Sequence, residues 1–263
     1  MSMPTGGSSA DQQAYQEPHR SRIGSLGSFF SATFRDRAHN ALVDTPVLGN
    51  AYVRLRRQLR HAVVTPRTEL ILDGFPRSAN AYAEWAFRYA NGEGVRLAVR
   101  LHSPRAVQIG VRYAIPTIVL AREPRGAVAS WLQYKPGLHA QEAFERYAHY
   151  YNAVNESRDH VIVAPFDQVV ADFGAVITAC NTRFGTRFTP YPGGTEAEAW
   201  VRQRIESAWS DDETGELAEH EVPRPSANRP DAAAVLEGLL DDPAVKSSLL
   251  AAERAYQRFL AGS

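Results

Sequence analysis

One segment of the chain, Glu69–Tyr82, constrains the fold more than any other. Its residues are Glu-Leu-Ile-Leu-Asp-Gly-Phe-Pro-Arg-Ser-Ala-Asn-Ala-Tyr, in which an apolar run stops at a Gly-Phe-Pro turn and a helix begins after a basic residue and a serine. A strand that turns tightly into a helix directs free backbone N–H groups and the positive end of the helix dipole at one point. Because Arg77 adds a positive charge there, the segment predicts a phosphate- or sulfate-binding site.

The other short apolar runs predict a parallel sheet. We expect strands at about residues 68–73, 95–101, 116–121 and 160–164, joined by stretches with helical periodicity. Strands that alternate with helices indicate an α/β fold, in which right-handed crossovers wind a parallel β-sheet flanked by helices. A chain of 263 residues suffices for one such domain.

The N-terminal part is expected to differ from this core. Residues 1–28 are rich in Gly, Ser and Gln without periodicity, which predicts a disordered tail. Residues 29–62 have the pattern of one or two amphipathic helices, so the folded domain is assigned to residues 29–263. The basic stretch Arg54–His61 within it could give a weak peripheral membrane contact, although a helix with a solvated charged face is the more frequent case.

Composition and motifs argue against several functional classes. Lys plus Arg equals Asp plus Glu, at 29 each, so no overall basic field favours nucleic acid as a partner. The one cysteine, Cys180, excludes an intramolecular disulfide, and with no apolar leader in the sequence we expect a cytoplasmic location. The sequence contains no run of 18 apolar residues, so it predicts no membrane span. No His/Cys cluster predicts a metal site, so we expect no metal.

The loop Pro76–Tyr82 lacks the Gly-Lys-Ser/Thr ending of ATP and GTP phosphate loops, which argues against a kinase or GTPase. It resembles the phosphosulfate loop of sulfotransferases that use 3′-phosphoadenosine-5′-phosphosulfate (PAPS), written Pro-Lys/Arg-Ser-Gly-Thr/Asn-Thr/Ser. The resemblance covers about residues 66–260 and implies the P-loop-like sulfotransferase fold, in the form of bacterial members. An ordinary helix start capped by Ser78 is the alternative. The donor-binding loop residues that the resemblance implies are Pro76, Arg77, Ser78, Ala79, Asn80, Ala81 and Tyr82.

A second match lies in Ile115–Ser130, which has the pattern of a buried strand, a turn and a helix. It is similar to the family's 3′-phosphate motif, in which an Arg at the strand end is followed eight residues later by a Ser. Arg122 and Ser130 have this spacing, so the resemblance implies that they bind the 3′-phosphate. Taken alone, Ser130 would more often be a helix-surface serine.

The candidate catalytic residues are His102 and Arg77. The segment Val99–Pro104 looks like the Lys-Thr-His segment of cytosolic sulfotransferases, whose His removes the proton from the acceptor hydroxyl. The resemblance therefore implies that His102 is the general base, and that Arg77 stabilises charge on the leaving phosphate. An imidazole suits this role near neutral pH. The alternatives are that His102 caps or packs at a strand end, and that Glu84 is the base.

Further matches concern the adenine pocket and a lid. Tyr82 stands where the family often has a Trp stacked on adenine, and a core tyrosine is the alternative. Phe166 takes the position of a family Tyr and is expected to line the same pocket. The segment Val222–Arg229 resembles the Pro-Ser-x-x-Arg lid of bacterial members, with Arg229 as the cation over the 3′-phosphate. A solvated loop arginine is the alternative.

Two residues depart from the family pattern. Ala79 replaces the usual loop Gly, so a positive φ there would cost roughly 1 kcal/mol or more, and Ala81 replaces a Thr or Ser. The sequence thus predicts a PAPS-dependent sulfotransferase that acts on a hydroxyl of a carbohydrate, lipid or small metabolite. The alternatives are a catalytically silent nucleotide-binding relative and a membrane-associated interaction protein. No motif identifies the acceptor or the oligomeric state.

Overall fold

The structure is a computed structural model, and it describes residues 64–210 and 231–262. Three expectations lie outside the described residues: the N-terminal tail, the amphipathic helices with the basic stretch Arg54–His61, and the lid cation Arg229. Within the described ranges, no helix combines the length and the apolar character that a membrane crossing requires.

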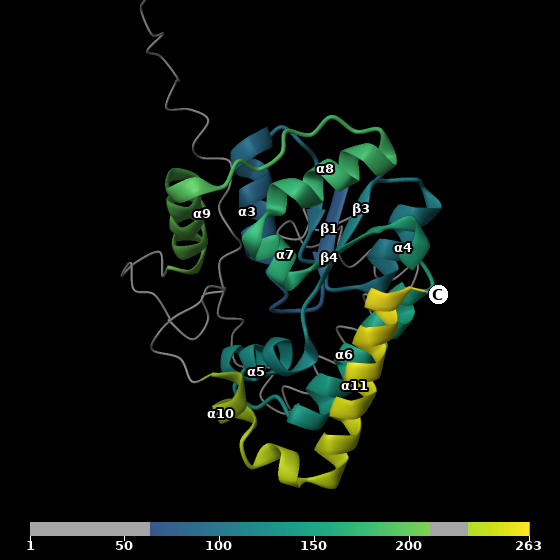
Figure 1. The fold of residues 1–263 in the computed structure, drawn as a ribbon, viewed down its shortest axis with the longest axis vertical. Helices are drawn as coiled ribbons and strands as arrows, with labels where there is room; N and C mark the ends of the chain where they lie inside the picture. Colours follow the sequence, from purple (N-terminus) through teal and green to yellow (C-terminus); the bar gives the residue numbers. More distant parts are fainter. Residues whose placement is uncertain (1–63, 211–230, 263) are drawn as a thin grey trace, which may run out of the picture.

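A four-stranded parallel sheet organises the described residues (Figure 1). Its strands are β1 (Leu70–Gly74), β2 (Leu97–Val99), β3 (Thr117–Ala121) and β4 (Ile162–Pro165). The order across the sheet is β2-β1-β3-β4, and Leu72 of the central strand β1 pairs with Val99 on one side and Ile118 on the other. The predicted α/β class, with a parallel sheet flanked by helices, is confirmed.

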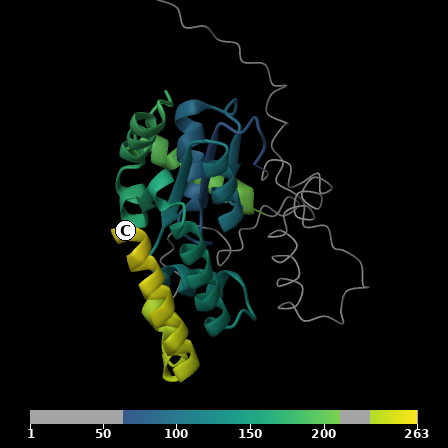
Figure 2. The same cartoon turned by 90° about the vertical axis from the view of Figure 1, so that its right-hand side faces the viewer.

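Helices cover both faces of this sheet (Figures 1 and 2). One face packs against α3 (Asn80–Asn91) and α8 (Phe173–Phe184), and α9 (Gly194–Trp209) packs against α3. The other face packs against α4 (Pro104–Arg112) and α6 (Ala140–Asn155), and α11 (Pro243–Ala261) lies along α6. The shorter helices are α5 (Pro124–Tyr134), α7 (Phe166–Ala171) and α10 (Ala232–Leu236), with 3₁₀ turns at Arg158–His160 and Leu239–Asp241.

The strands are apolar because both of their faces are buried. In β1, Leu70 and Leu72 pack towards α3 and α8, while Ile71 points to the opposite face, as expected for side chains that alternate along a strand. Gly74 ends β1 against β3, where a Cβ would lie 2.6 Å from the carbonyl oxygen of Leu120. Glycine therefore lets the backbones at the end of β1 and β3 approach closely.

The strand order also indicates where a ligand would be expected to bind. From β1 the chain passes to β2 on one side, and from β2 it crosses to β3 on the other side of β1. The connections that leave the carboxyl ends of β1 and β3 thus run in opposite directions. In open α/β sheets ligands bind outside the strand ends at such a switch point. The segments that follow Gly74 and Ala121 are therefore the place to look for a site.

Candidate functional site

All four strands carry a candidate residue to the same edge of the sheet. Because the strands are parallel, their carboxyl ends lie together. The first chemically distinctive side chain after each strand is Arg77 after β1, His102 after β2, Arg122 after β3 and Phe166 after β4. Parallel pairing thus gathers residues that are distant in sequence.

The loop between β1 and α3 has an unusual backbone. Arg77 and Ala79 both have φ of 67°, in the left-handed region, and Ala79 is the N-cap residue of α3. Ala79 therefore has the backbone conformation that is costly for a residue with a Cβ. No side chain caps α3 by a hydrogen bond, and the first N–H groups of a helix have no intrahelical acceptor. Left-handed residues are a feature of backbone turns whose N–H groups can face an anion.

Arg77, Arg122 and Ser130 meet beside this loop. The Nε of Arg77 donates a hydrogen bond to the Oγ of Ser130 on α5, at 2.9 Å. The Nη1 of Arg122 donates to the backbone oxygen of Arg77, at 3.1 Å, across 45 positions of sequence. Arg77 thus contacts both of the residues that the resemblance assigns to the other anionic end of the same ligand.

The guanidinium of Arg122 is partly buried. Its Cζ is 4.4 Å from the centroid of the Phe166 ring, and its side chain is 25 % exposed. Burial lowers the pKa of Arg122, whereas the carboxylates of Glu123 and Asp167 act in the opposite direction. The hydroxyl of Tyr147 donates to the backbone oxygen of Arg122. The Arg122 guanidinium is only partly hydrated, and the backbone of Arg122 is held by Tyr147. A cation in such a position is well placed to attract an anion.

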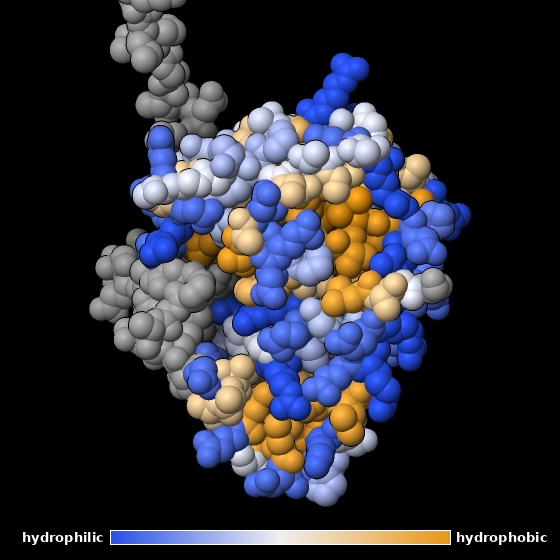
Figure 3. Space-filling view, in the orientation of Figure 1, coloured by the Kyte–Doolittle hydropathy of each residue, from blue (hydrophilic) through white to orange (hydrophobic). Residues whose placement is uncertain are grey.

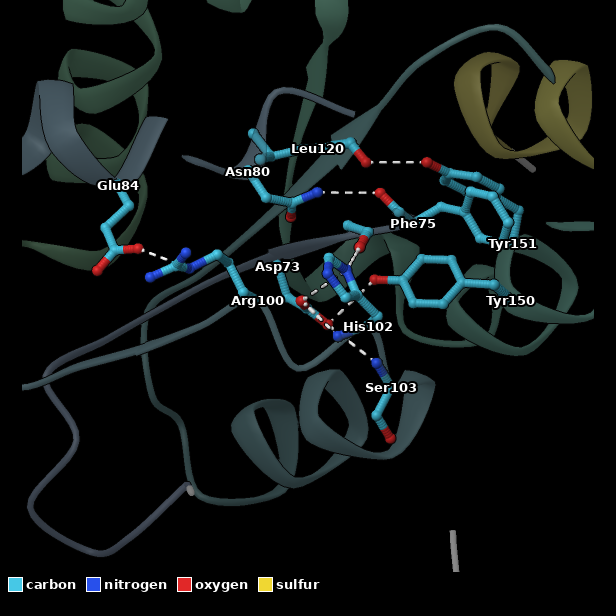
Figure 4. A network of polar contacts seen from close by, with 11 residues as sticks. Asp73, Phe75, Asn80, Glu84, Arg100, His102, Ser103, Leu120, Tyr150 and Tyr151 are labelled. Atoms are coloured by element: carbon cyan, nitrogen blue, oxygen red, sulfur yellow. Dashed lines mark hydrogen bonds and ion pairs between the residues drawn. The ribbon is translucent and has the colours of Figure 1, made fainter. Parts of the chain in front are cut away.

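The imidazole of His102 packs against the end of β1 (Figure 4). Its Nδ1 lies 2.7 Å from the backbone oxygen of Gly74, and its backbone N–H donates to Oδ1 of Asp73 at 2.9 Å. The Oδ2 of Asp73 accepts the N–H of Ser103 at 3.2 Å. His102 is therefore held against Gly74, which lies three residues before Arg77 in the sequence, and one third of its side chain is exposed. Sequence reasoning missed Asp73, although a charged residue in an apolar strand was a signal.

Several loop residues turn inward instead of facing a ligand. The side chains of Ser78 and Ala81 are buried, and the Nδ2 of Asn80 donates to the backbone oxygen of Phe75 at 2.9 Å. Pro76 is half-buried. The loop therefore presents backbone N–H groups and Arg77 as its donors.

Tyr82 is tied to α9. Its hydroxyl donates to Oε1 of Glu198 at 2.7 Å, an oxygen that also accepts the hydroxyl of Tyr191 at 3.0 Å. Burial, followed by these interactions with Glu198, raises the pKa of Tyr82. The ring packs edge-on against Tyr191. These contacts correspond to the alternative interpretation of Tyr82 as a packed tyrosine.

Glu84, the alternative base, is used in ion pairs. Its carboxylate is fully buried, and its Oε1 lies 3.1 Å from the Nε of Arg88. Its Oε2 lies 2.9 Å from the Nε of Arg100 (Figure 4). The guanidinium of Arg100 in turn lies over the ring of Trp209, 5.4 Å from its centroid. A fully buried carboxylate that is paired with two arginines is shielded from a substrate hydroxyl.

On the face shown in Figure 3, hydrophilic residues cover the middle of the molecule between an apolar area beside α8 and another between α10 and α11. Among residues 64–210 and 231–262, no three or more His, Cys, Asp or Glu side chains are grouped as metal ligands.

Comparisons of the chain with protein-family models, with curated proteins and with solved structures gave no match. The functional conclusion therefore depends on the residues at the carboxyl edge of the sheet.

Proposed function

We propose that this chain is a PAPS-dependent sulfotransferase, which transfers a sulfuryl group from PAPS to a hydroxyl of a carbohydrate, lipid or small metabolite. One observation carries the proposal: Arg77 and Arg122, 45 positions apart, converge at the switch point of the sheet. Two cations beside a helix N-terminus without a side-chain cap suit a ligand with two anionic groups.

The residues present fit such a donor. The backbone N–H groups at the start of α3, together with Arg77, would hold the sulfate-bearing end. Arg122 and Ser130 would hold the 3′-phosphate, and the ring of Phe166 beneath Arg122 offers an apolar surface for adenine next to it. Since Ser130 already accepts a hydrogen bond from Arg77, this serine links the two anion sites.

The reaction needs a proton acceptor and a stabilised leaving group. When bound, PAPS supplies the sulfuryl group, and the products are a sulfate ester, adenosine 3′,5′-bisphosphate and one proton. His102 would accept this proton, a role that typically contributes ~10²- to 10⁴-fold to rate. Arg77 would stabilise the negative charge that develops on the leaving phosphate.

Calorimetric titration with adenosine 3′,5′-bisphosphate tests the binding site. We expect wild-type protein to bind, and Arg122→Ala to weaken binding by at least about tenfold, or 1.4 kcal/mol. Arg125→Ala is the matched control, because Arg125 lies three residues away but pairs with Glu253 on α11, at 3.0 Å. Absence of binding to wild-type protein, or equal losses in the two variants, would contradict the assignment.

A transfer assay with radiolabelled PAPS and a panel of hydroxyl acceptors tests the activity. A nucleotide-binding protein without catalysis is the second candidate, favoured by Ala81, which places a buried methyl where the loop of the family has a hydroxyl. Binding of adenosine 3′,5′-bisphosphate without transfer to any acceptor would select this candidate. Transfer that is lost in His102→Ala would select the sulfotransferase.

A further inference from the structure

A buried carboxylate lies directly beneath the candidate base. Asp73 is the fourth residue of β1, and its side chain has no exposed surface. It shares a face of the sheet with Ile71, because side chains alternate along a strand. The helices α4 and α6 pack on this face. A buried carboxylate is costly unless hydrogen bonds compensate it, so its partners explain why the fold tolerates it.

Those partners come from two other elements (Figure 4). The backbone N–H of His102 donates to Oδ1 of Asp73 at 2.9 Å, and that of Ser103 donates to Oδ2 at 3.2 Å. The hydroxyl of Tyr150 on α6 lies 3.4 Å from Oδ2 and donates to it. One carboxylate therefore fastens the turn between β2 and α4 to the end of β1.

The turn that Asp73 fastens is strained. Arg100 and His102 have φ of 56° and 50°, a region that costs a residue with a Cβ roughly 1–2 kcal/mol. Such conformations persist only where the surroundings impose them. Asp73 helps to impose this conformation on the turn by accepting hydrogen bonds from the backbone N–H groups of His102 and Ser103.

The position of the ring decides which nitrogen is basic. The Nδ1 of His102 lies 2.7 Å from the backbone oxygen of Gly74. A carbonyl oxygen only accepts hydrogen bonds, so Nδ1 must carry the proton. In the neutral imidazole the lone pair then resides on Nε2, which is the nitrogen left to accept a proton from a substrate.

We propose that Asp73 is a positioning residue, which holds His102 against Gly74 as the Nδ1–H tautomer and so keeps Nε2 as the proton acceptor. Its catalytic meaning rests on the proposed function. In that reaction the acceptor hydroxyl gives its proton to Nε2 while its oxygen forms the new bond to sulfur. The bond from sulfur to the bridging phosphate oxygen breaks, and its electron pair leaves with adenosine 3′,5′-bisphosphate. Asp73 touches none of these atoms.

The tautomer is measurable in the free protein. Long-range ¹H–¹⁵N correlation spectra of protein labelled at histidine nitrogens distinguish Nδ1–H from Nε2–H rings at about pH 9, where ordinary imidazoles are neutral. The spectrum of His102→Gln assigns the signal. We expect the Nδ1–H pattern for His102 in the wild-type protein. A wild-type spectrum with the Nε2–H pattern overturns the inference without any Asp73 variant, and therefore also if such a variant fails to fold.

The variant Asp73→Asn tests the role of the carboxylate itself. It keeps the size of the side chain but places an NH₂ group where the turn needs an acceptor. We expect a mixture of tautomers at His102 and a kcat lowered by about 10- to 100-fold, with the KM for PAPS changed by less than about twofold. An unchanged tautomer and an unchanged kcat overturn the inference.

Asp172→Asn is the matched control. Its Oδ1 also accepts a backbone N–H, that of Ala175 at 2.9 Å, but it caps α8 on the other face of the sheet. We expect this variant to keep the His102 tautomer and kcat. The tautomer readout needs no turnover, so it supports or overturns the positioning role even if the wild-type protein transfers no sulfuryl group. That last result would overturn the proposed function alone.

Discussion

Replacing Ala79 by glycine measures the strain stored in the loop between β1 and α3. Ala79 has φ 67° and ψ 20°, directly before α3. For a residue with a Cβ, this conformation costs roughly 1–2 kcal/mol, and glycine does not have this cost. The change also gives the unfolded chain more freedom, which costs about 0.4–1 kcal/mol. The two effects oppose each other, so a control is needed to separate them.

Ala199 provides that control. It is exposed in the middle of α9 and has no positive φ. Ala199→Gly therefore gives the unfolded chain more freedom without relieving any backbone strain in the folded state. It should destabilise the protein by about 0.5–1 kcal/mol. The difference between the two Ala→Gly changes cancels the term for the unfolded chain. Ala79→Gly should be more favourable than Ala199→Gly by about 1–2 kcal/mol. Loss of the half-buried methyl of Ala79, worth less than about 0.8 kcal/mol, moves the result towards the lower value.

Urea unfolding followed by circular dichroism gives the comparison, with free energies from linear extrapolation. Both variants should show the slope of the wild-type protein, so that the midpoints report stability. If Ala79→Gly destabilises the protein as much as Ala199→Gly does, the loop is not strained at this residue. Calorimetry on the same variants should show that Ala79→Gly still binds adenosine 3′,5′-bisphosphate, because glycine permits the same backbone path.

Three further outcomes are expected. Burial raises the pKa of the Cys180 thiol to about 11, so a thiolate-directed reagent at about pH 8 should react only after unfolding, and rapid labelling of native protein would contradict this. Gly126→Ala should weaken binding of adenosine 3′,5′-bisphosphate in calorimetry, since a Cβ there would overlap Oε1 of Glu123 and lie 3.0 Å from Nη2 of Arg122. Burial raises the pKa of Asp73 above 3.8. The folded state therefore binds the proton of the Asp73 carboxyl group more tightly than the unfolded state does. The stability that this protonation contributes is lost as the pH rises through the folded-state pKa of Asp73. The stability advantage of wild-type protein over Asp73→Asn, from urea unfolding at about pH 4 and about pH 8, should therefore be smaller at the higher pH, and a larger advantage there would be inconsistent with the shift.

The fold could be predicted because its signal is local. Parallel strands buried on both faces appear as continuous apolar runs, and the four runs lie within a few residues of the four strands. The largest difference is β2, expected at about residues 95–101 and observed as Leu97–Val99. The strand ends early because Arg100 adopts a left-handed φ, which breaks the extended backbone. That choice depends on contacts that no window of sequence contains.

The site could be predicted only as far as the backbone determines it. That Arg77, His102 and Arg122 share one edge follows from three parallel strands and needs no side-chain information. How side chains use their hydrogen bonds is different. The hydroxyl of Tyr82 bonds Glu198, which is 116 residues away on α9, and no local pattern encodes where that helix packs.

Asp73 illustrates what can and what cannot be predicted from the sequence. A charge inside an apolar strand is expensive, and that cost can be seen in the sequence alone. What offsets it cannot be seen there, because the donors are His102 and Ser103, 29 and 30 residues away, and Tyr150, 77 residues away. A cost visible in sequence without a visible compensation is thus a signal that a distant contact exists. At Asp73 that contact holds the residue on which the proposed chemistry depends, so the polar interruption of β1 is best explained by the position it gives to His102.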